Sequence, residues 1–351
     1  MKKALIFLGM LTVLQSYGQA NTEALQHYFP FVEQLKKDQP LSDSLWQTFL
    51  SQAGNRIYIE SNNLPQSYLE EYRQKLELVY RPSMDSLLQS KLPTDPMLSA
   101  IHRYKTQEPN LKEHMAWLEK TDLLDTMLSH ARKFLPKRLQ ALPFQPQIYY
   151  TSLGSEGSAS EREVIISLLT SYDLDRIKAG AFGGHEIHHF LRKSKAIKPL
   201  ADAHKGLYYA LDAMLNEGLA DLVDKPYFLN EQSDWDQKDI YQSYLLDKAP
   251  AVIIALNEIV EKLAQSEESY LDERQYRQLL ENSVGHIPGY YMAKTIKDNG
   301  LLNRLIEQAD NPFTFVALYN KAAKRAGYGA PLFSGQTIVY LRKLEQNYTT
   351  K

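Results

Sequence analysis

The chain has 351 residues, of which 44% are hydrophobic and 23% charged, so its composition is that of a folded globular protein and not of a disordered one. It contains no cysteine, which excludes disulfides, thiolate catalysis, cysteine-ligated zinc and a lipid-anchored cysteine. The formal net charge is −2 and no block of basic residues stands out, so we expect no nucleic-acid partner.

Residues 1–18 have the pattern of a secretory signal peptide. Lys2 and Lys3 precede an apolar run over residues 4–14. A short stretch with small residues, 16–18, follows, and we expect cleavage after Gly18. The apolar run is too short to cross a bilayer, and no later stretch reaches the roughly 18 apolar residues that a membrane-spanning helix needs. We therefore expect an exported protein, periplasmic or secreted, with no membrane span after signal removal.

Residues 19–142 are expected to form a helical N-terminal region. Apolar side chains recur at three- and four-residue spacing over residues 68–80 and 123–139, as they do on the buried face of an amphipathic helix. Prolines in this region stand at or near expected helix starts, where a missing N–H costs little. The pattern changes near residue 143, which we take as a boundary.

Residues 143–351 are expected to hold a catalytic region with a helical C-terminal part. Two segments, residues 147–151 and 164–168, have the composition of β-strands and flank a glycine- and serine-rich loop at residues 154–160. Helical patterning then continues to the end, with an expected break near Pro226. The sequence therefore predicts an α+β fold that is predominantly α-helical and has one small β-sheet.

The most informative segment is His-Glu-x-x-His at residues 185–189, on an expected helix. Residues four apart lie one turn above each other, so His185 and His189 can both reach one tetrahedral zinc ion. Glu186 is rotated away from the ligands but is close enough to accept a proton from a metal-bound water. His188 is a competing ligand in an irregular geometry, and a chance grouping on a solvent-facing helix is the alternative interpretation.

A third ligand is expected from the next helix. Glu217 follows His189 by 28 residues, and a break near Gly206 leaves room for a loop and the return of a second helix. Two imidazoles and one carboxylate would hold one zinc per chain and leave the fourth position to water.

Asp221 lies one turn beyond Glu217 on the same helix face. There it could accept a hydrogen bond from the outer nitrogen of a ligand histidine, and we expect this to be His185 in preference to His189. Asp224 is expected to lie about 60° off that face, at roughly 100° of rotation per residue, and to play no part.

These residues together resemble the gluzincin metallopeptidases, in which a helix with His-Glu-x-x-His precedes a helix with a glutamate ligand and an aspartate. The resemblance covers about residues 147–224. It implies a zincin-like core in which an extended peptide lies along an edge strand, here residues 164–169, and small residues at 180–184 let the motif helix pack beneath the sheet. Metzincins do not fit, because Arg192 and Lys195 stand where their motif has glycine and a third histidine.

The Gly-Gly-His-Glu context and the export signal also resemble a family of bacterial proteins expected to be zinc-dependent peptidases. Zincins need a hydrogen-bond donor for the oxyanion that forms opposite the metal, and histidine or tyrosine supplies it. His286, Tyr290 and Tyr291, in a later segment, are the candidates. Packing of these three residues in a helical core is the competing interpretation.

The function expected from the sequence is hydrolysis of peptide bonds in a peptide or protein substrate, with Glu186 as general base. Two alternatives stay open. One is a zinc hydrolase that acts on another kind of bond, and the other is a noncatalytic cell-envelope binding protein that retains the zinc site. The presence of Glu186 argues against the second, because metal binding alone needs the histidines and not the base.

Overall fold

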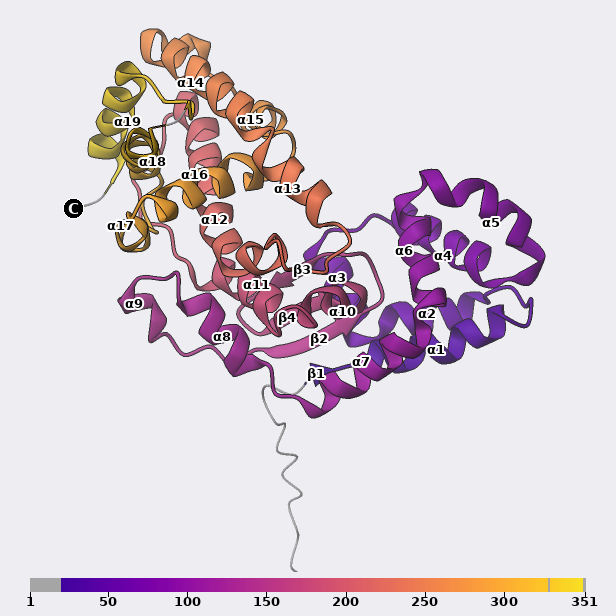
Figure 1. The fold of residues 1–351 in the computed structure, drawn as a ribbon. Helices are drawn as coiled ribbons and strands as arrows, with labels where there is room; N and C mark the ends of the chain where they lie inside the picture. Colours follow the sequence, from indigo (N-terminus) through magenta and orange to yellow (C-terminus); the bar gives the residue numbers. More distant parts are fainter. Residues whose placement is uncertain (1–19, 328, 350–351) are drawn as a thin grey trace, which may run out of the picture.

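The computed structural model describes residues 20–327 and 329–349. The expected signal peptide, residues 1–18, lies outside the described residues. The fold is predominantly α-helical with one four-stranded sheet, which confirms the predicted α+β class (Figure 1). Within the described part of the chain, no helix combines the length and the apolar composition needed to cross a membrane.

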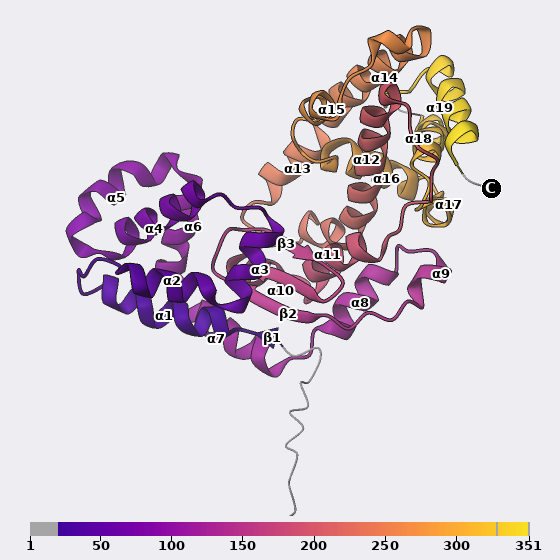
Figure 2. The ribbon, with the colours of Figure 1, turned by 180° about the vertical axis from the view of Figure 1, so that it is seen from behind.

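The N-terminal part is helical, as predicted, and its helices α1 to α7 lie to the right of the sheet in Figure 1 and to the left in Figure 2. The expected helix at 123–139 is divided in two: α8 ends at Arg132, and Pro136 is the residue that precedes α9. The elements are α1 (Glu23–Leu35), α2 (Asp43–Ser51), α3 (Ala53–Ser61), α4 (Gln66–Tyr80), η1 (Pro82–Met84), α5 (Asp85–Lys91), η2 (Leu92–Thr94), α6 (Pro96–Thr106), α7 (Glu108–Lys120), α8 (Leu124–Arg132) and α9 (Lys137–Gln140).

The sheet has the strand order β1-β2-β4-β3. β1 (Ala20–Asn21) and β4 (Glu163–Ser167) pair in parallel with β2 (Gln147–Thr151), and β3 (Gly157–Ala159) pairs antiparallel with β4. The expectation that residues 164–169 form the edge strand is wrong, because β4 lies between β2 and β3.

The edge strand on that side of the sheet is β3, inside the segment expected to be a loop, and β1 forms the other edge. Its sequence, Gly-Ser-Ala, has low strand propensity, so this strand depends on its pairing with β4. β4 is apolar on both faces and buried over Val164 to Ser167, as is typical of an interior strand.

The motif helix α11 (Ala181–Leu191) follows α10 (Leu168–Asp175) and packs closely against α8. A Cβ atom added at Gly183 would lie 2.6 Å from Met127 Sδ, and one added at Gly184 would lie 2.7 Å from His130 Cβ. The small residues therefore permit a close approach, as expected, but at these two positions the neighbour is α8 and not the sheet. The sheet contacts α11 mainly through β3.

The second half of the chain is built around one long helix, α12 (Asp202–Phe228), which packs against α11 and α16. The expected breaks at Gly206 and Pro226 are wrong, because α12 is continuous over 27 residues. A Cβ at Gly206 would lie 2.3 Å from the carbonyl oxygen of Leu271, so this glycine serves close packing and does not end the helix. The remaining elements are α13 (Lys238–Leu246), α14 (Ala249–Gln265), η3 (Glu267–Ser269), α15 (Glu273–Leu279), α16 (His286–Asp298), α17 (Leu302–Glu307), α18 (Pro312–Ala326) and α19 (Gly335–Tyr348).

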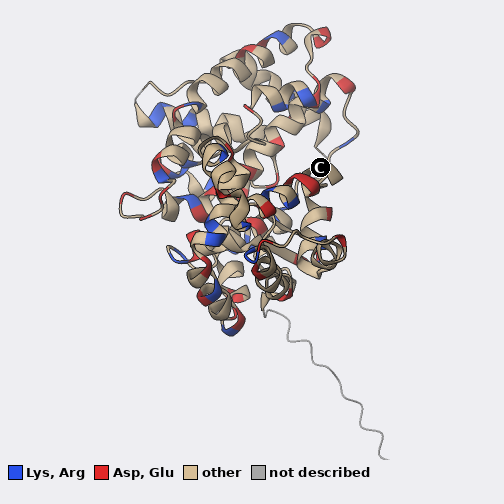
Figure 3. Cartoon of the chain, turned by 90° about the vertical axis from the view of Figure 1, so that its right-hand side faces the viewer, with Lys and Arg blue, Asp and Glu red and all other residues tan. Residues whose placement is uncertain are grey.

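Two large hydrophobic clusters form the core. The first runs from Leu25 to Leu191 and includes buried residues of the sheet and α11, and the second runs from Phe134 to Leu344 and includes those of α12 and α16. The expected boundary near residue 143 falls within the first cluster, and the division into regions there stays a prediction. Acidic and basic residues are interspersed along the helices (Figure 3).

Candidate metal centre

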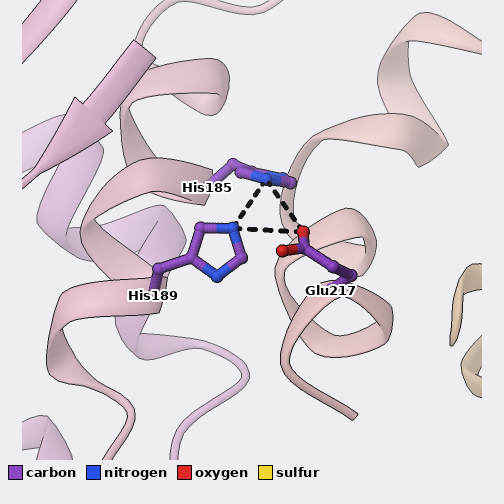
Figure 4. A group of neighbouring side chains, drawn as sticks. All are labelled: His185, His189 and Glu217. Atoms are coloured by element: carbon purple, nitrogen blue, oxygen red, sulfur yellow. Dashed lines mark hydrogen bonds and ion pairs between the residues drawn. The ribbon is translucent and has the colours of Figure 1, made fainter. Parts of the chain in front are cut away.

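The two motif histidines and Glu217 converge where α11 packs against α12 (Figure 4). His185 Nε2 lies 3.0 Å from His189 Nε2. Glu217 Oε2 lies 3.3 Å from His189 Nε2 and 3.9 Å from His185 Nε2. For metal–ligand distances near 2.0–2.1 Å, tetrahedral ligands are about 3.3–3.4 Å apart, so these three atoms have the separations of a zinc triad.

The surroundings of Glu217 fit a metal ligand. Its side chain is buried, and Oε2 has no hydrogen-bond partner among the described residues. A buried carboxylate oxygen that accepts no hydrogen bond is costly, and a cation held between it and the two imidazoles would remove that cost. The donor set of two nitrogens and one oxygen is also one that zinc accepts.

His188 does not take part in this group. Its ring is fully buried and its Nε2 lies 3.5 Å from the carbonyl oxygen of Phe134. Burial holds the pKa of His188 well below its usual value, so the ring is neutral at ordinary pH. The competing interpretation of His188 as a ligand therefore finds no support in the geometry.

His286 is the first residue of α16 and follows Asp221 by 65 residues in the chain. The fold places its ring beside the triad. Its Nδ1 donates a hydrogen bond to Asp221 at 3.0 Å, and its Nε2 lies 3.2 Å from Glu217 Oε2. The approach depends on two glycines, because a Cβ added at Gly218 of α12 would lie 2.5 Å from the carbonyl oxygen of Gly289 in α16. The sequence indicated His286 as a candidate oxyanion donor but did not indicate that its ring pairs with Asp221.

The two tyrosine candidates lie differently. Tyr290 is buried, and burial raises the pKa of its hydroxyl. The nearby carboxylates of Asp221 and Asp224 raise this pKa further. Tyr291 packs its ring 6.3 Å from that of Tyr319, within the second hydrophobic cluster. Neither tyrosine hydroxyl has a hydrogen bond to the triad or to His286 among the described contacts, so their roles as oxyanion donors stay predictions.

A buried ionic network lies behind the histidines, and the sequence predicted only part of it. Asp224 Oδ1 lies 3.3 Å from His185 Nδ1, whereas the nearest oxygen of Asp221 is 3.7 Å from that nitrogen. The expected pairing of Asp221 with His185 is therefore replaced by pairing with His286, and the expectation that Asp224 plays no part is wrong. An offset of about 60° is small enough for both aspartates to share one face of α12.

Lys225 joins the two aspartates. Its Nζ donates to Asp224 Oδ2 at 2.9 Å and lies 3.3 Å from Asp221 Oδ1, and the two carboxylates are fully buried. The ammonium offsets the charge of this carboxylate pair, so the grouping of His185 with the two aspartates is a poor alternative site for a cation. A sequence signal existed, because charged residues at 217, 221, 224 and 225 interrupt an otherwise apolar stretch of α12.

The charges of the site shift several pKa values. Burial raises the pKa of the Glu186 carboxyl, and His185 and His189 oppose this only in part. Burial alone would lower the pKa of His189, but Glu217, with smaller contributions from Glu186 and Asn216, outweighs burial and raises that pKa to about 9. In the same way Asp221 and Glu217 raise the pKa of His286 to about 9. The metal-free site therefore holds protonated imidazoles at neutral pH.

We expect zinc affinity to increase with pH up to about 9, because only the deprotonated ring of His189 can bind metal. Each pH unit below that value should weaken apparent affinity roughly tenfold for the one proton released. The raised pKa of His189 also stabilises the metal-free fold. This contribution is fully present below pH 6.5 and is lost as the pH rises through about 9. Competition with a fluorescent zinc chelator over this range measures the affinity, and a pH-independent affinity would contradict the expectation.

Replacement of Asp224 by asparagine is expected to weaken zinc binding by about 10- to 100-fold, because the amide no longer holds the His185 ring through an ionic hydrogen bond. Chelator competition at one pH measures the effect. Asp202→Asn, an exposed position at the start of the same helix, is the control and should leave zinc affinity unchanged. Equal zinc affinities of the two variants would show that Asp224 does not support zinc binding.

Comparison with known proteins gives one match. Residues 46–327 match the family described as "Putative zinc dependent peptidase (DUF5700)", and this range includes every residue of the triad and the ionic network. No curated protein and no solved structure matches the chain significantly.

Proposed function

Because the chain belongs to the family described as "Putative zinc dependent peptidase (DUF5700)", we propose that it is an exported, single-zinc metallopeptidase of the gluzincin type. The observation that carries the proposal is the triad of His185, His189 and Glu217, whose ligand atoms converge to within 3.0–3.9 Å of one another beside Glu186. When bound there, zinc would polarise the scissile carbonyl and lower the pKa of a water molecule.

Glu186 is suited to move the proton. Its carboxylate accepts no hydrogen bond among the described residues, and burial raises its pKa toward the range of an effective general base. A carboxylate oxygen of Glu186 would accept the proton of the attacking water and then donate it to the nitrogen of the leaving amine. A Cβ at Gly157 would lie 3.0 Å from Glu186 Cγ, so the edge strand β3 passes directly over the base.

His286 is suited to stabilise the oxyanion. Asp221 accepts the hydrogen bond from Nδ1, which orients the ring and favours its protonated form. The Nε2–H group then serves as donor to the substrate oxygen, at a position next to the Glu217 ligand. The free edge of β3 supports a peptide as substrate, since an extended chain can pair with it through backbone hydrogen bonds.

The test combines metal content with turnover. Purified wild-type protein, loaded with zinc and dialysed, should retain about one zinc per chain by elemental analysis and cut members of a mixed peptide library, as seen by mass spectrometry. The His189→Ala variant should lose both properties. A wild-type protein that retains no more zinc than this variant, or that retains zinc and leaves every peptide intact, would contradict the proposal.

A further inference from the structure

A cavity of about 500 Å³ lies between the N-terminal helices and the motif helix. Its walls come from α6, the loop before β3, α10, α11, α12, the segment that follows α12, and α13. Aromatic rings form much of the lining, and three of them make a continuous wall: Phe228 and Trp235 have ring centroids 6.1 Å apart, and Trp235 and Tyr241 are 5.4 Å apart. The volume is within the usual range for pockets that bind small groups.

The cavity adjoins the candidate metal centre through Phe182. Phe182, which lines it, lies one turn before Glu186 on α11, and its ring stacks on that of His185 at 6.3 Å. A Cβ added at Gly157 would lie 2.9 Å from Phe182 and 3.0 Å from Glu186, so β3 passes over both side chains. A peptide paired with the free edge of β3 would therefore run past the base and past the mouth of the cavity.

The charges around the cavity favour an apolar occupant. Arg103 and Asp173 form a two-pronged ion pair at 2.6 and 2.9 Å, and Lys225 is held by the buried aspartates. Glu156, exposed at the rim, is the lining residue whose carboxylate has no ionic partner among the described residues. It would repel an acidic side chain, while no unpaired cation is there to attract one.

We propose that this cavity binds one large apolar side chain of the substrate, so that the enzyme selects peptides with an aromatic or long aliphatic residue close to the scissile bond. The inference rests on the proposed peptidase function. Full burial of a phenylalanine side chain against these rings, compared with alanine, should tighten binding by roughly 10- to 100-fold.

Binding to the zinc-loaded Glu186→Gln protein tests the cavity separately from catalysis. The probes are blocked peptides of glycine and serine that carry a single Phe, Ala or Asp at each central position in turn, and calorimetry measures their affinity. The Phe peptide should bind most tightly at one position, and the Asp peptide most weakly there. Ser99→Trp, an exposed position of α6 that lines the cavity, should fill it and remove most of the Phe preference.

The matched control is Ser86→Trp, an exposed position of α5 outside the cavity, which should keep the full preference. Equal binding of the Phe and Ala peptides at every position, including binding of neither, would overturn the proposal, and so would an unchanged preference in Ser99→Trp. Turnover of the same peptides by the wild type is scored separately. If the Phe peptide binds selectively but is never cut, the cavity stands and the proposed peptidase function fails.

Discussion

Replacement of Glu186 by glutamine is expected to lower kcat for peptide hydrolysis by about 10²- to 10⁴-fold, the usual contribution of a positioned general base. The amide keeps the shape of the side chain but cannot accept the proton of the attacking water. Because Glu186 is not one of the three converging ligands, the variant should retain the same zinc content as the wild type. Steady-state kinetics and elemental analysis on one preparation measure both quantities.

A suitable control is Glu113→Gln, which makes the same chemical change at an exposed position of α7. It should leave kcat and zinc content unchanged. A Glu186→Gln protein that turns over peptides at the wild-type rate would assign the proton transfer to another group. Loss of zinc from this variant would instead make Glu186 part of the metal site, and the assignment of Glu217 as third ligand would need revision.

Replacement of Lys225 by methionine is expected to have the largest effect on stability. The ammonium lies 2.9 Å from Asp224 and 3.3 Å from Asp221, and methionine would leave the buried Asp224 carboxylate without its ammonium partner and Asp221 with His286 as its remaining cation. Removal of one partner from a buried ion pair costs about 3–5 kcal/mol. We therefore expect the free energy of unfolding of the metal-free protein to fall by about that amount, as measured by urea denaturation.

The effect should extend to the metal site, because Lys225 holds both carboxylates that orient imidazole rings. Zinc affinity should fall together with stability in Lys225→Met, and Lys225→Arg should restore part of both. Lys205→Met on the same helix removes an exposed ion pair with Asp202 and should change stability by less than about 0.5 kcal/mol. A similarly small change in Lys225→Met would mean that the aspartates are neutral or solvated in the folded protein.

Several features of this protein follow from local sequence alone. The four-residue spacing of His185 and His189 places both rings on one face of any helix, because an α-helix has 3.6 residues per turn. Glu217 and Asp221 obey the same rule on α12, and the composition of residues 147–151 was enough to indicate the strand β2. These are short-range properties, and the sequence determined them correctly.

Contacts between distant segments decided the rest. β3 forms because it pairs with β4. The edge strand on this side of the sheet is therefore Gly157–Ala159 and not the expected residues 164–169. The close approach of Gly218 and Gly289 brings His286 onto Asp221, which leaves Asp224 to contact His185. Helical periodicity fixes which side chains share a face, but the rotation and separation of two packed helices depend on side-chain volumes along the whole contact, which no local pattern contains.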